Sequence, residues 1–329
     1  DVAVKVLPRG VANEGERAFT ATLLAVTSPK PLRAYFVTGH GEHDLESTEN
    51  DLGYRKFISV LNENYIQAEP LSLLATNVPS DCNLLVVAGP TVAFSEPELE
   101  RIDQYLAQGG RLFALFNVVG IKNGPTGLEK ILANWGVDVT TNIVEAPEPT
   151  TVKTDVIVQT FSPTHPVVNP LLDSRLQLIL PRAVGRLRSR PQAVDAPQVE
   201  ELALSSPKAF TKSAPTERRA FPLMVAVEKG AIKNVVTERR TTRMLVVGDS
   251  IFLGNRQIDS GANRDFAGYA VNWLLDRPHL LEDLGPRPVV TYRLLMTRSQ
   301  LKAAEWILLL GMPGVALAIG GLVWLRRRT

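Results

Sequence analysis

Two polar segments of the sequence carry side chains whose types could do chemistry. In TGHGEHD, residues 38–44, His40 lies between two glycines and two residues before Glu42. The second segment is GDS at 248–250. Imidazole, carboxylate and hydroxyl groups exchange protons, act as nucleophiles or hold polar ligands through hydrogen bonds. The glycines allow a tight turn that leaves the imidazole of His40 accessible, so the first segment has the clearer functional pattern.

A serine hydrolase is the enzymatic alternative. GDS at 248–250 and DRPH at 276–279 match the serine and Asp-xx-His blocks of GDSL-type esterases in residue type. In those enzymes the two blocks lie at opposite ends of the domain, whereas 26 residues separate Ser250 from Asp276 here. A straight helix between them would hold Asp276 and His279 about 20 Å or more from the serine. We therefore expect no catalytic residue, and a GDSL-like or amidotransferase-like hydrolase using Ser250 or His40 stays as the alternative.

Other chemistries have weaker support. His40, Glu42, His43 and Asp44 are possible metal ligands, but their spacing is not that of a helical zinc motif, so we expect no metal. The sequence has no Walker A loop, no G-x-G-x-x-G and no nucleophile elbow, so we expect no cofactor. Cys82 precedes the apolar run LLVVAG, and we interpret it as a structural thiol.

The elements around these segments alternate between strand and helix. Short apolar runs at 33–38, 84–89, 111–116 and 244–248 are typical of buried strands. Helical periodicity lies between them, and it predicts helices from about Asn13, from Asn50 or Asp51, and from Asn263. Two further helices carry capping boxes, Ser95 with Glu98 and Thr126 with Glu129. This order predicts an α/β fold with a doubly wound, mostly parallel, flavodoxin-like sheet.

The carboxyl ends of parallel strands meet at one edge of a sheet, where ligands bind. We therefore expect a ligand-binding or partner-binding site at this edge. Its predicted residues are His40, Gly41, Glu42, Asn117, Asp249 and Ser250.

The alternation breaks near residue 145. Residues 145–225 contain 11 of the 23 prolines, together with short β-type runs. Because proline removes a hydrogen-bond donor from a sheet, residues 145–240 are predicted to form an irregular β-rich insertion beside the sheet, within one domain spanning residues 1–285. The basic run Arg182–Arg190 is interpreted as a solvated face.

The C-terminal residues indicate a membrane anchor. Trp306–Leu325 contains no charged residue, and three arginines follow it. Twenty helical residues span about 30 Å, the hydrocarbon thickness of a bilayer. This predicts a juxtamembrane linker at 286–304, a transmembrane helix at 305–325 and a cytoplasmic basic tail at 326–329. The predicted anchor residues are Trp306 and Trp324 at the interfaces, Pro313, Gly314 and Ala318 along a helix-packing face, and Arg326, Arg327 and Arg328 in the tail.

Composition limits the remaining alternatives. The chain is 45% hydrophobic and 21% charged with a net charge of +2, so nucleic acid is not expected as a partner. A soluble sugar- or peptide-binding protein with a buried C-terminal helix is the non-enzymatic alternative to a membrane protein. No signal peptide is visible before Asp1, and an upstream N-terminal segment stays possible.

Several segments together resemble the GldG-like auxiliary proteins of ABC-type transport systems, a family named for its gliding-motility members. They are YFVTGHGEHD at 35–44, VVGDSIFLGN at 246–255, NRDFAGYAVNWLL at 263–275 and the terminal apolar span with RRR. The resemblance implies an extracytoplasmic domain similar in fold to class I glutamine amidotransferases without their nucleophile. It also implies an ABC permease and its ATPase as partners. The family commonly reads GDSDF where this chain has GDSIF, so Ile251 replaces an acidic residue.

The sequence thus predicts a non-catalytic, membrane-anchored auxiliary subunit of an ABC-type transport system. Its strand-end loops would bind a partner protein or a small polar ligand. We expect it in the cell (inner) membrane, with a single C-terminal span in the lipid bilayer and the bulk of the chain outside the cytoplasm.

Overall fold

The computed structural model describes residues 31–50, 52–118, 124–146, 154–188, 196–230, 241–277, 302–303 and 305–328. The predicted helix near Asn13 and most of the predicted linker lie outside these ranges. The chain divides into two units. The first comprises residues 1–146 and 154–289, and the second comprises residues 147–153 and 290–329.

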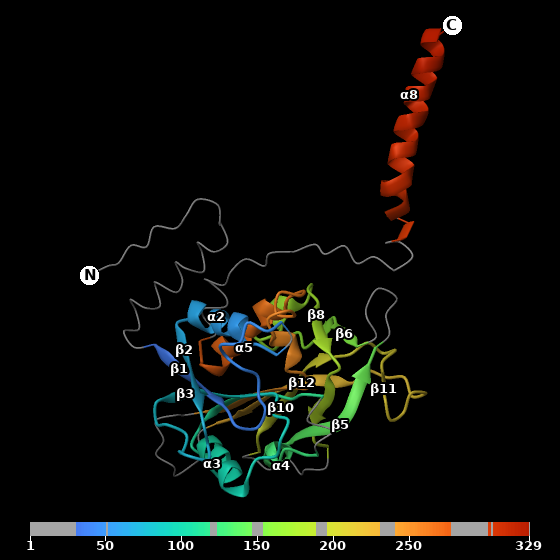
Figure 1. The fold of residues 1–329 in the computed structure, drawn as a ribbon. Coiled ribbons are helices and arrows are strands. Elements are labelled where there is room, and N and C mark those ends of the chain that lie inside the picture. The colour runs from blue at the N-terminus through green and yellow to red at the C-terminus, as the bar shows by residue number, and fades with distance from the viewer. Residues whose placement is uncertain are drawn as a thin grey trace, which may run out of the picture. The chain divides into compact units, whose positions relative to one another are not determined.

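An eight-stranded sheet forms the centre of the first unit (Figure 1). Its order is β2-β1-β3-β4-β13-β12-β10-β7. The first five strands in this order are parallel to their neighbours, and the last three are antiparallel. The bounds are β1 Leu32–Val37, β2 Ile66–Leu71, β3 Cys82–Ala88, β4 Arg111–Leu115, β13 Thr242–Val247, β12 Pro222–Lys229, β10 Gln198–Leu204 and β7 Thr160–Phe161.

This topology confirms the predicted mostly parallel α/β sheet. The parallel part has the flavodoxin-like order 2-1-3-4-5, with β13 in the fifth position. The strands β1, β3, β4 and β13 are largely buried, which explains why they read as continuous apolar runs.

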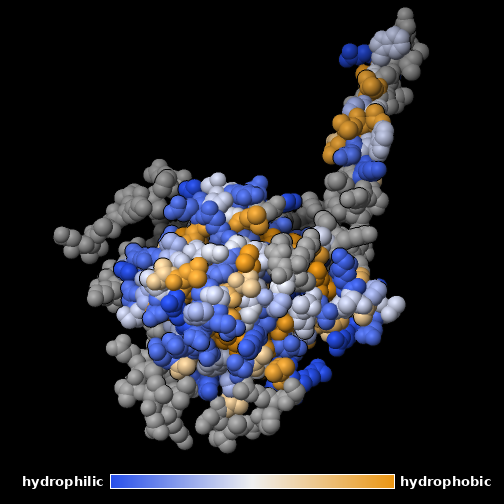
Figure 2. Space-filling model, turned by 60° about the horizontal axis from the view of Figure 1, so that its bottom comes forward, coloured by the Kyte–Doolittle hydropathy of each residue, from blue (hydrophilic) through white to orange (hydrophobic). Residues whose placement is uncertain are grey.

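Helices cover both faces of the sheet. The helices α2 (Arg55–Glu63) and α5 (Asn263–Leu274) lie on one face, and α3 (Glu96–Ala107) and α4 (Leu128–Asn134) lie on the other (Figure 1). Each face has its own apolar core: Phe57 and Phe266 belong to one, and Ile102 and Leu132 to the other. Outside these cores the visible face of this unit is mainly hydrophilic, with scattered hydrophobic residues (Figure 2).

The β-rich segment forms two small sheets and also extends the central one. β5 (Val137–Glu145) pairs with β9 (Arg182–Arg186) and β11 (Phe210–Thr211), and β6 (Asp155–Val158) pairs with β8 (Leu176–Ile179). A short 3-10 helix, Asn169–Leu171, precedes β8. The prediction that the insertion only packs beside the sheet is wrong for β7, β10 and β12, which are antiparallel strands of the central sheet. The first of them, β12, pairs with β13. Antiparallel strands are commonly added in this way at the edge of a parallel sheet.

The basic run also differs from its interpretation. Arg186 and Arg188 are exposed, but Arg182 is only 1% exposed. The prediction of a solvated face is therefore wrong for Arg182. Its backbone N–H donates to the carbonyl of Gly248, which holds it against the end of β13.

Two of the helix starts follow local signals, and a third does not. The Glu98 carboxylate accepts the backbone N–H of Ser95 at 2.9 Å, and that of Glu129 accepts the N–H of Thr126 at 3.0 Å. The first contact belongs to the predicted capping box of α3, whereas the N-cap of α4 is Gly127, one residue after the predicted Thr126, and the full second box does not form. The helix α2, however, begins at Arg55 rather than after Asn50 or Asp51. The side chain of Asn255 accepts the N–H of Lys56 at 2.9 Å, so a residue 199 positions away supplies the cap.

The second unit contains a C-terminal helix. A π-helical turn, Ile307–Gly311, continues into α8, Met312–Arg328. The wide turn directly precedes Pro313, which has no N–H for the carbonyl of Leu309 four residues earlier. Hydrophobic residues occur along this helix (Figure 2), and Leu309 and Leu317 are 72% and 77% exposed. Within the described part of the chain, no helix has the length and apolarity needed to cross a membrane.

Gly248 connects the end of β13 to β9 at close range. A Cβ on Gly248 would lie 2.0 Å from the backbone oxygen of Arg182, whereas a Cβ on Gly268 in α5 would meet no atom within 4 Å. We expect Gly248→Ala to lower the free energy of unfolding by about 3 kcal/mol, because the contact is with backbone that cannot rotate away. Gly268→Ala, the matched control, should raise it by about 1 kcal/mol. Urea unfolding of both variants measures the difference, and equal effects would contradict the close approach.

Candidate functional site

The candidate site lies where parallel strands end. The segments that follow β1, β3, β4 and β13 leave the same edge of the sheet, because these strands run in the same direction. They carry His40 and His43, Gly89, Asn117, and Asp249 with Ser250, in that order. The six residues predicted from the sequence therefore lie on this edge, in the three groups of contacts described below.

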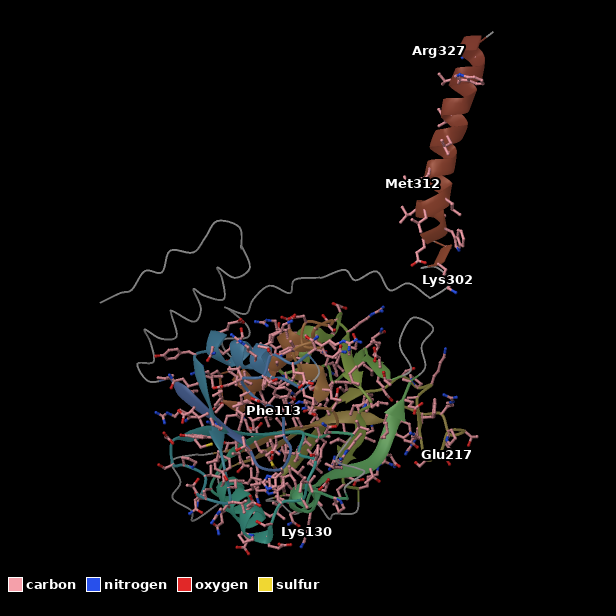
Figure 3. The ribbon with its side chains drawn as sticks, in the orientation of Figure 1. Phe113, Lys130, Glu217, Lys302, Met312 and Arg327 are labelled. Atoms are coloured by element: carbon pink, nitrogen blue, oxygen red, sulfur yellow. The ribbon has the colours of Figure 1, made fainter. Side chains whose placement is uncertain are left out.

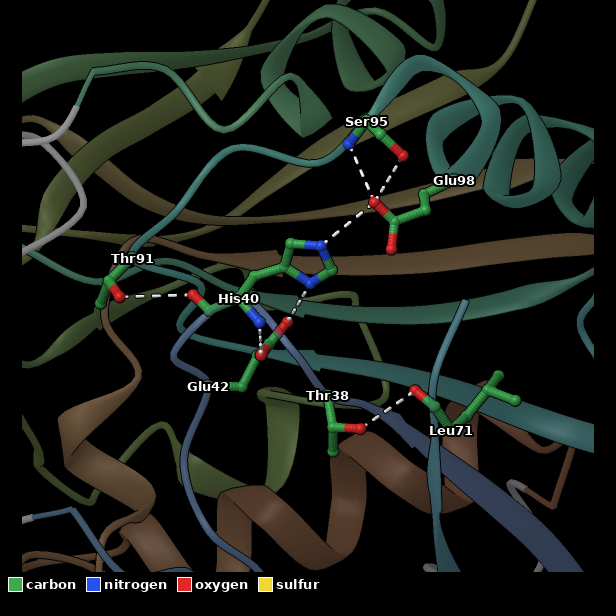
Figure 4. Close-up of polar contacts among 7 residues, drawn as sticks. All are labelled: Thr38, His40, Glu42, Leu71, Thr91, Ser95 and Glu98. Atoms are coloured by element: carbon green, nitrogen blue, oxygen red, sulfur yellow. Dashed lines mark hydrogen bonds and ion pairs between the residues drawn. The ribbon is translucent and has the colours of Figure 1, made fainter. Parts of the chain in front are cut away.

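The first cluster is a buried imidazole held between two carboxylates (Figure 4). His40 Nδ1 lies 3.1 Å from Glu42 Oε1, and His40 Nε2 lies 3.2 Å from Glu98 Oε2. All three side chains are at most 6% exposed. This cluster ties the loop after β1 to the first turn of α3.

Backbone geometry turns His40 inward. Gly39 and Gly41 have φ values of +118° and +76°, which a side chain would disfavour. The tight turn lets the backbone N–H of His40 donate to Glu42 Oε2 at 2.7 Å. The ring also packs on Phe94, with centroids 4.0 Å apart. The glycines therefore bury the imidazole, where the sequence predicted that they would expose it.

Glu98 has two tasks. It is the capping residue of α3, and the same oxygen faces His40 (Figure 4). Burial acts to raise the pKa of Glu98, but the hydrogen bonds from Ser95 and the nearby His40 outweigh it, so the pKa lies below its ordinary value. The sequence indicated the cap but carried no signal for the shared contact with His40.

The second cluster pairs a serine with His43, which the sequence suggested only as a possible metal ligand. His43 Nε2 lies 2.8 Å from Ser250 Oγ, and His43 Nδ1 lies 2.8 Å from the carbonyl of Leu52. A carbonyl only accepts, so Nδ1 carries the proton and Nε2 accepts from the serine hydroxyl. Burial lowers the pKa of His43, although the bond to Leu52 opposes it, and this favours the neutral ring. This is the arrangement of a nucleophile, a base and an orienting group.

Three features keep this pair closed. Ser250 and His43 are 0% and 5% exposed. Tyr54 stacks on His43 with ring centroids 4.3 Å apart and donates to the carbonyl of Ser250. Gly89 lies against both, since a Cβ there would come within 2.4 Å of Ser250 Oγ. The hydroxyl is packed into the interior of the strand-end edge.

Asp249 removes the donors that acyl transfer would need. Its carboxylate accepts the backbone N–H groups of Ile251 at 2.8 Å and Phe252 at 3.2 Å. It also accepts the N–H of Ile179 at 2.7 Å. N–H groups next to a nucleophile are the usual donors to an oxyanion, and those of Ile251 and Phe252, which follow Ser250, are already used.

The described residues of the two esterase-like blocks, Ser250 and Asp276, have other partners. Asp276 pairs with Arg243 at 2.8 Å, and the base of Ser250 is His43 rather than His279. His279 lies outside the described residues. These partners argue against a GDSL-type triad. The Ser250–His43 pair is a different nucleophile–base arrangement.

A third group of contacts surrounds Asn117. The guanidinium of Arg182 donates to the Asn117 carbonyl through Nε at 3.0 Å and Nη2 at 2.7 Å, and it pairs with Glu129 at 3.3 Å. Its plane also lies 5.3 Å from the centroid of Phe116. Burial lowers the pKa of Arg182, while Glu129 acts to raise it. The arginine thus fixes the chain after β4 rather than presenting a free cation.

The described residues contain no group of three or more His, Cys, Asp or Glu side chains that could hold a metal ion. The carboxylates of Glu42 and Glu98 lie on opposite sides of the His40 ring, so they cannot converge on one ion. Cys82 is buried at the start of β3, away from this edge, with its Sγ 3.6 Å from the Tyr105 hydroxyl.

Fold and site together define a flavodoxin-like α/β domain whose strand-end edge is closed by buried polar clusters. Residues 33–172 match a family described as an ABC-type uncharacterized transport system. The match supports the family of auxiliary components of ABC-type transport systems. It covers less than half of the chain and does not distinguish a GldG-like subtype. No curated protein matches the chain significantly.

Solved structures are similar to this chain at low sequence identity, and the first of those below shares its fold. The mmIFT52 N-terminal domain is 13% identical, with a TM-score of 0.53 over 74% of this chain and 97% of that chain. A putative ThuA-like protein from Parabacteroides merdae is 14% identical, with a TM-score of 0.45 over 75% and 90% of the two chains. A glutamine amidotransferase from Thermotoga maritima is 12% identical, with a TM-score of 0.37 over 77% and 99%.

The buried carboxyl of Asp249 predicts a pH dependence of stability. Burial raises its pKa to about 7, although its backbone N–H donors oppose this. Because the folded state then binds the proton more tightly than the unfolded state, stability is fully present below about pH 4 and is lost as the pH rises to about 7, by about 4 kcal/mol. In Asp249→Asn this loss should disappear from urea unfolding between these pH values. Asp173→Asn, on an exposed turn, is the control, and an unchanged slope in Asp249→Asn would contradict the assignment.

Proposed function

We propose that this protein is a non-catalytic, membrane-anchored auxiliary subunit of an ABC-type transport system, of the GldG-like kind. Its strand-end loops bind a partner protein of the complex. One observation carries this proposal: buried polar clusters fill the edge of the sheet at which α/β proteins usually bind substrates. A partner would therefore meet loop backbone and exposed side chains at this edge.

The exposed side chains on this edge suit protein contact. Leu52 and Val92 are 50% and 52% exposed. The carbonyl of Leu52 holds His43, and the N–H of Val92 donates to the carbonyl of His40. The buried clusters thus fix the backbone from which both apolar side chains project. Preorganised apolar contacts are favoured at protein interfaces because they lose little entropy on binding.

The membrane anchor is part of the same proposal. Trp306–Leu325 has no charged residue and ends at an arginine triplet, which supports a span with a short cytoplasmic tail. The described part of the terminal helix exposes apolar side chains around it, including Leu308, Val315 and Val323. Small residues at 314 and 318 favour a second membrane helix alongside, for which a permease is the natural source. The first unit would then lie outside the cytoplasm.

The partner surface can be tested without disturbing the buried clusters. Leu52→Glu/Val92→Glu adds two charges to the exposed edge, and Ala107→Glu/Gln108→Glu adds two at the exposed C-terminal end of α3, at the opposite edge of the sheet. Membranes are washed with alkaline carbonate, solubilised in mild detergent and used for affinity purification. We expect wild type and the α3 control to stay in the membrane pellet and retain an ABC permease. The Leu52/Val92 variant should retain at least tenfold less.

His40→Ala/Glu42→Ala, which removes the support of the loop, should also lose the permease, with thermal unfolding used to check that the domain remains folded. Release of the wild type by carbonate would contradict the anchor. Retention of the permease by every variant would contradict the surface.

A serine hydrolase is the second candidate, because Ser250 and His43 have the distance and tautomer of a nucleophile and its base. The closed edge and the use of neighbouring N–H groups by Asp249 argue against it. We expect a fluorophosphonate probe to leave the full chain unlabelled at neutral pH. Labelling that is lost in Ser250→Ala but kept in Ser260→Ala, another buried serine, would establish the hydrolase instead.

A further inference from the structure

A loop of the β-rich segment concentrates positive charge. Residues 206–220, here called the basic loop, contain Lys208, Lys212, Arg218 and Arg219 and one acidic residue, Glu217. Four positive charges and one negative charge give +3, which exceeds the net charge of +2 for the whole chain. All five side chains belong to exposed residues. The loop follows β10 and includes the short strand β11. Glu217 lies at the outer margin of the unit (Figure 3).

The base of the basic loop is firmly held. Ser205 and Phe221 exchange two hydrogen bonds of 2.9 Å across it, and Arg219 donates its backbone N–H to the carbonyl of Ala209 at 2.9 Å. The N–H of Lys212 donates to the carbonyl of Ile143 in β5 at 3.1 Å. The backbone from which the exposed cations project is therefore fixed.

The two arginines are oriented before any partner binds. The guanidinium of Arg218 lies 4.1 Å from the ring centroid of Phe210, and Nη1 donates to the carbonyl of Lys208 at 3.0 Å. The guanidinium of Arg219 lies 4.6 Å from the centroid of Phe221. Stacking on an aromatic ring uses the face of a guanidinium and leaves N–H groups at its edge for an acceptor. Within the described residues, neither arginine has an ion pair with a carboxylate.

We propose that the basic loop is a docking site for a carboxylate-rich segment of a partner protein. Planar guanidinium groups at fixed positions match carboxylates through paired hydrogen bonds, which flexible lysines alone would not do. The one large apolar side chain between the cations, Phe210, is half-buried and covered by Arg218, and the other residues there, such as Pro215 and Thr216, are small or are prolines. The loop therefore exposes no large apolar side chain to insert into a lipid surface. If the chain is an auxiliary subunit as proposed, this site gives it a second contact, with carboxylates of a partner protein. The site is separate from the strand-end edge.

The test measures binding of a fluorescein-labelled deca-glutamate peptide to the full chain in a neutral detergent by fluorescence anisotropy. We expect binding that weakens with added salt. Arg218→Gln/Arg219→Gln should weaken it about tenfold, since two exposed pairs of somewhat under 1 kcal/mol each are removed. Arg55→Gln/Arg175→Gln removes two exposed arginines elsewhere and should change affinity less than twofold. Arg218→Lys/Arg219→Lys keeps the charge and should still weaken binding at least threefold.

Three outcomes would overturn the inference. They are absence of binding, equal losses in both glutamine variants, and wild-type affinity in the lysine variant. A lipid surface is tested by the gain in vesicle association when phosphatidylglycerol is added to phosphatidylcholine. If Arg218→Gln/Arg219→Gln abolishes that gain while the peptide does not bind, the loop is a lipid contact instead. None of these readouts involves the permease, so they are independent of the test of the strand-end surface.

Discussion

The carboxylate of Asp249 is the constraint on which the strand-end edge depends. It gathers backbone N–H groups from the turn after β13 and from Ile179 in β8, and so joins the last parallel strand to the β-rich segment. Burying an ionised carboxyl is costly, and the cost falls when several N–H groups point at it. Because the turn is fixed in this way, Ser250 can reach His43, and the loop after β1 closes over the edge.

The strand-end edge of this domain is closed, whereas many proteins of the same fold class have an open crevice there. In an open α/β sheet the strand ends usually leave a crevice for a ligand. Here the loop after β1 contributes one histidine to each of two buried clusters, His40 to the carboxylates and His43 to the serine. The interior of the edge is therefore committed to holding its own loops. A surface with fixed backbone and exposed apolar side chains suits association with a protein better than turnover of a small molecule.

Much of this architecture could be predicted from the sequence, because its signals are local. Apolar runs identified β1, β3, β4 and β13, and the boxes at Ser95 and Thr126 located the starts of α3 and α4. The residues predicted for the site also reach one edge.

What the sequence did not indicate are contacts between distant residues: the pairing of His43 with Ser250 spans 207 positions, and that of His40 with Glu98 spans 58. Burial of Arg182 was missed for the same reason, since its partners follow β4 and begin α4. A glycine-flanked histidine can be turned outward or inward, and only the position of Phe94 and Glu98 decides which.

The cap of α2 has a consequence for the order in which the chain matures. Asn255 supplies the acceptor for the first turn of this helix, and the same side chain donates to the carbonyls of Ser47 and Glu49 in the loop before it. During synthesis the ribosome releases α2 long before Asn255 emerges, so the helix and its preceding loop lack these bonds while the β-rich segment is still being made. The amino-terminal half therefore stays incompletely folded until the segment that carries Asn255 has been synthesised. A chaperone would have most to protect during this interval.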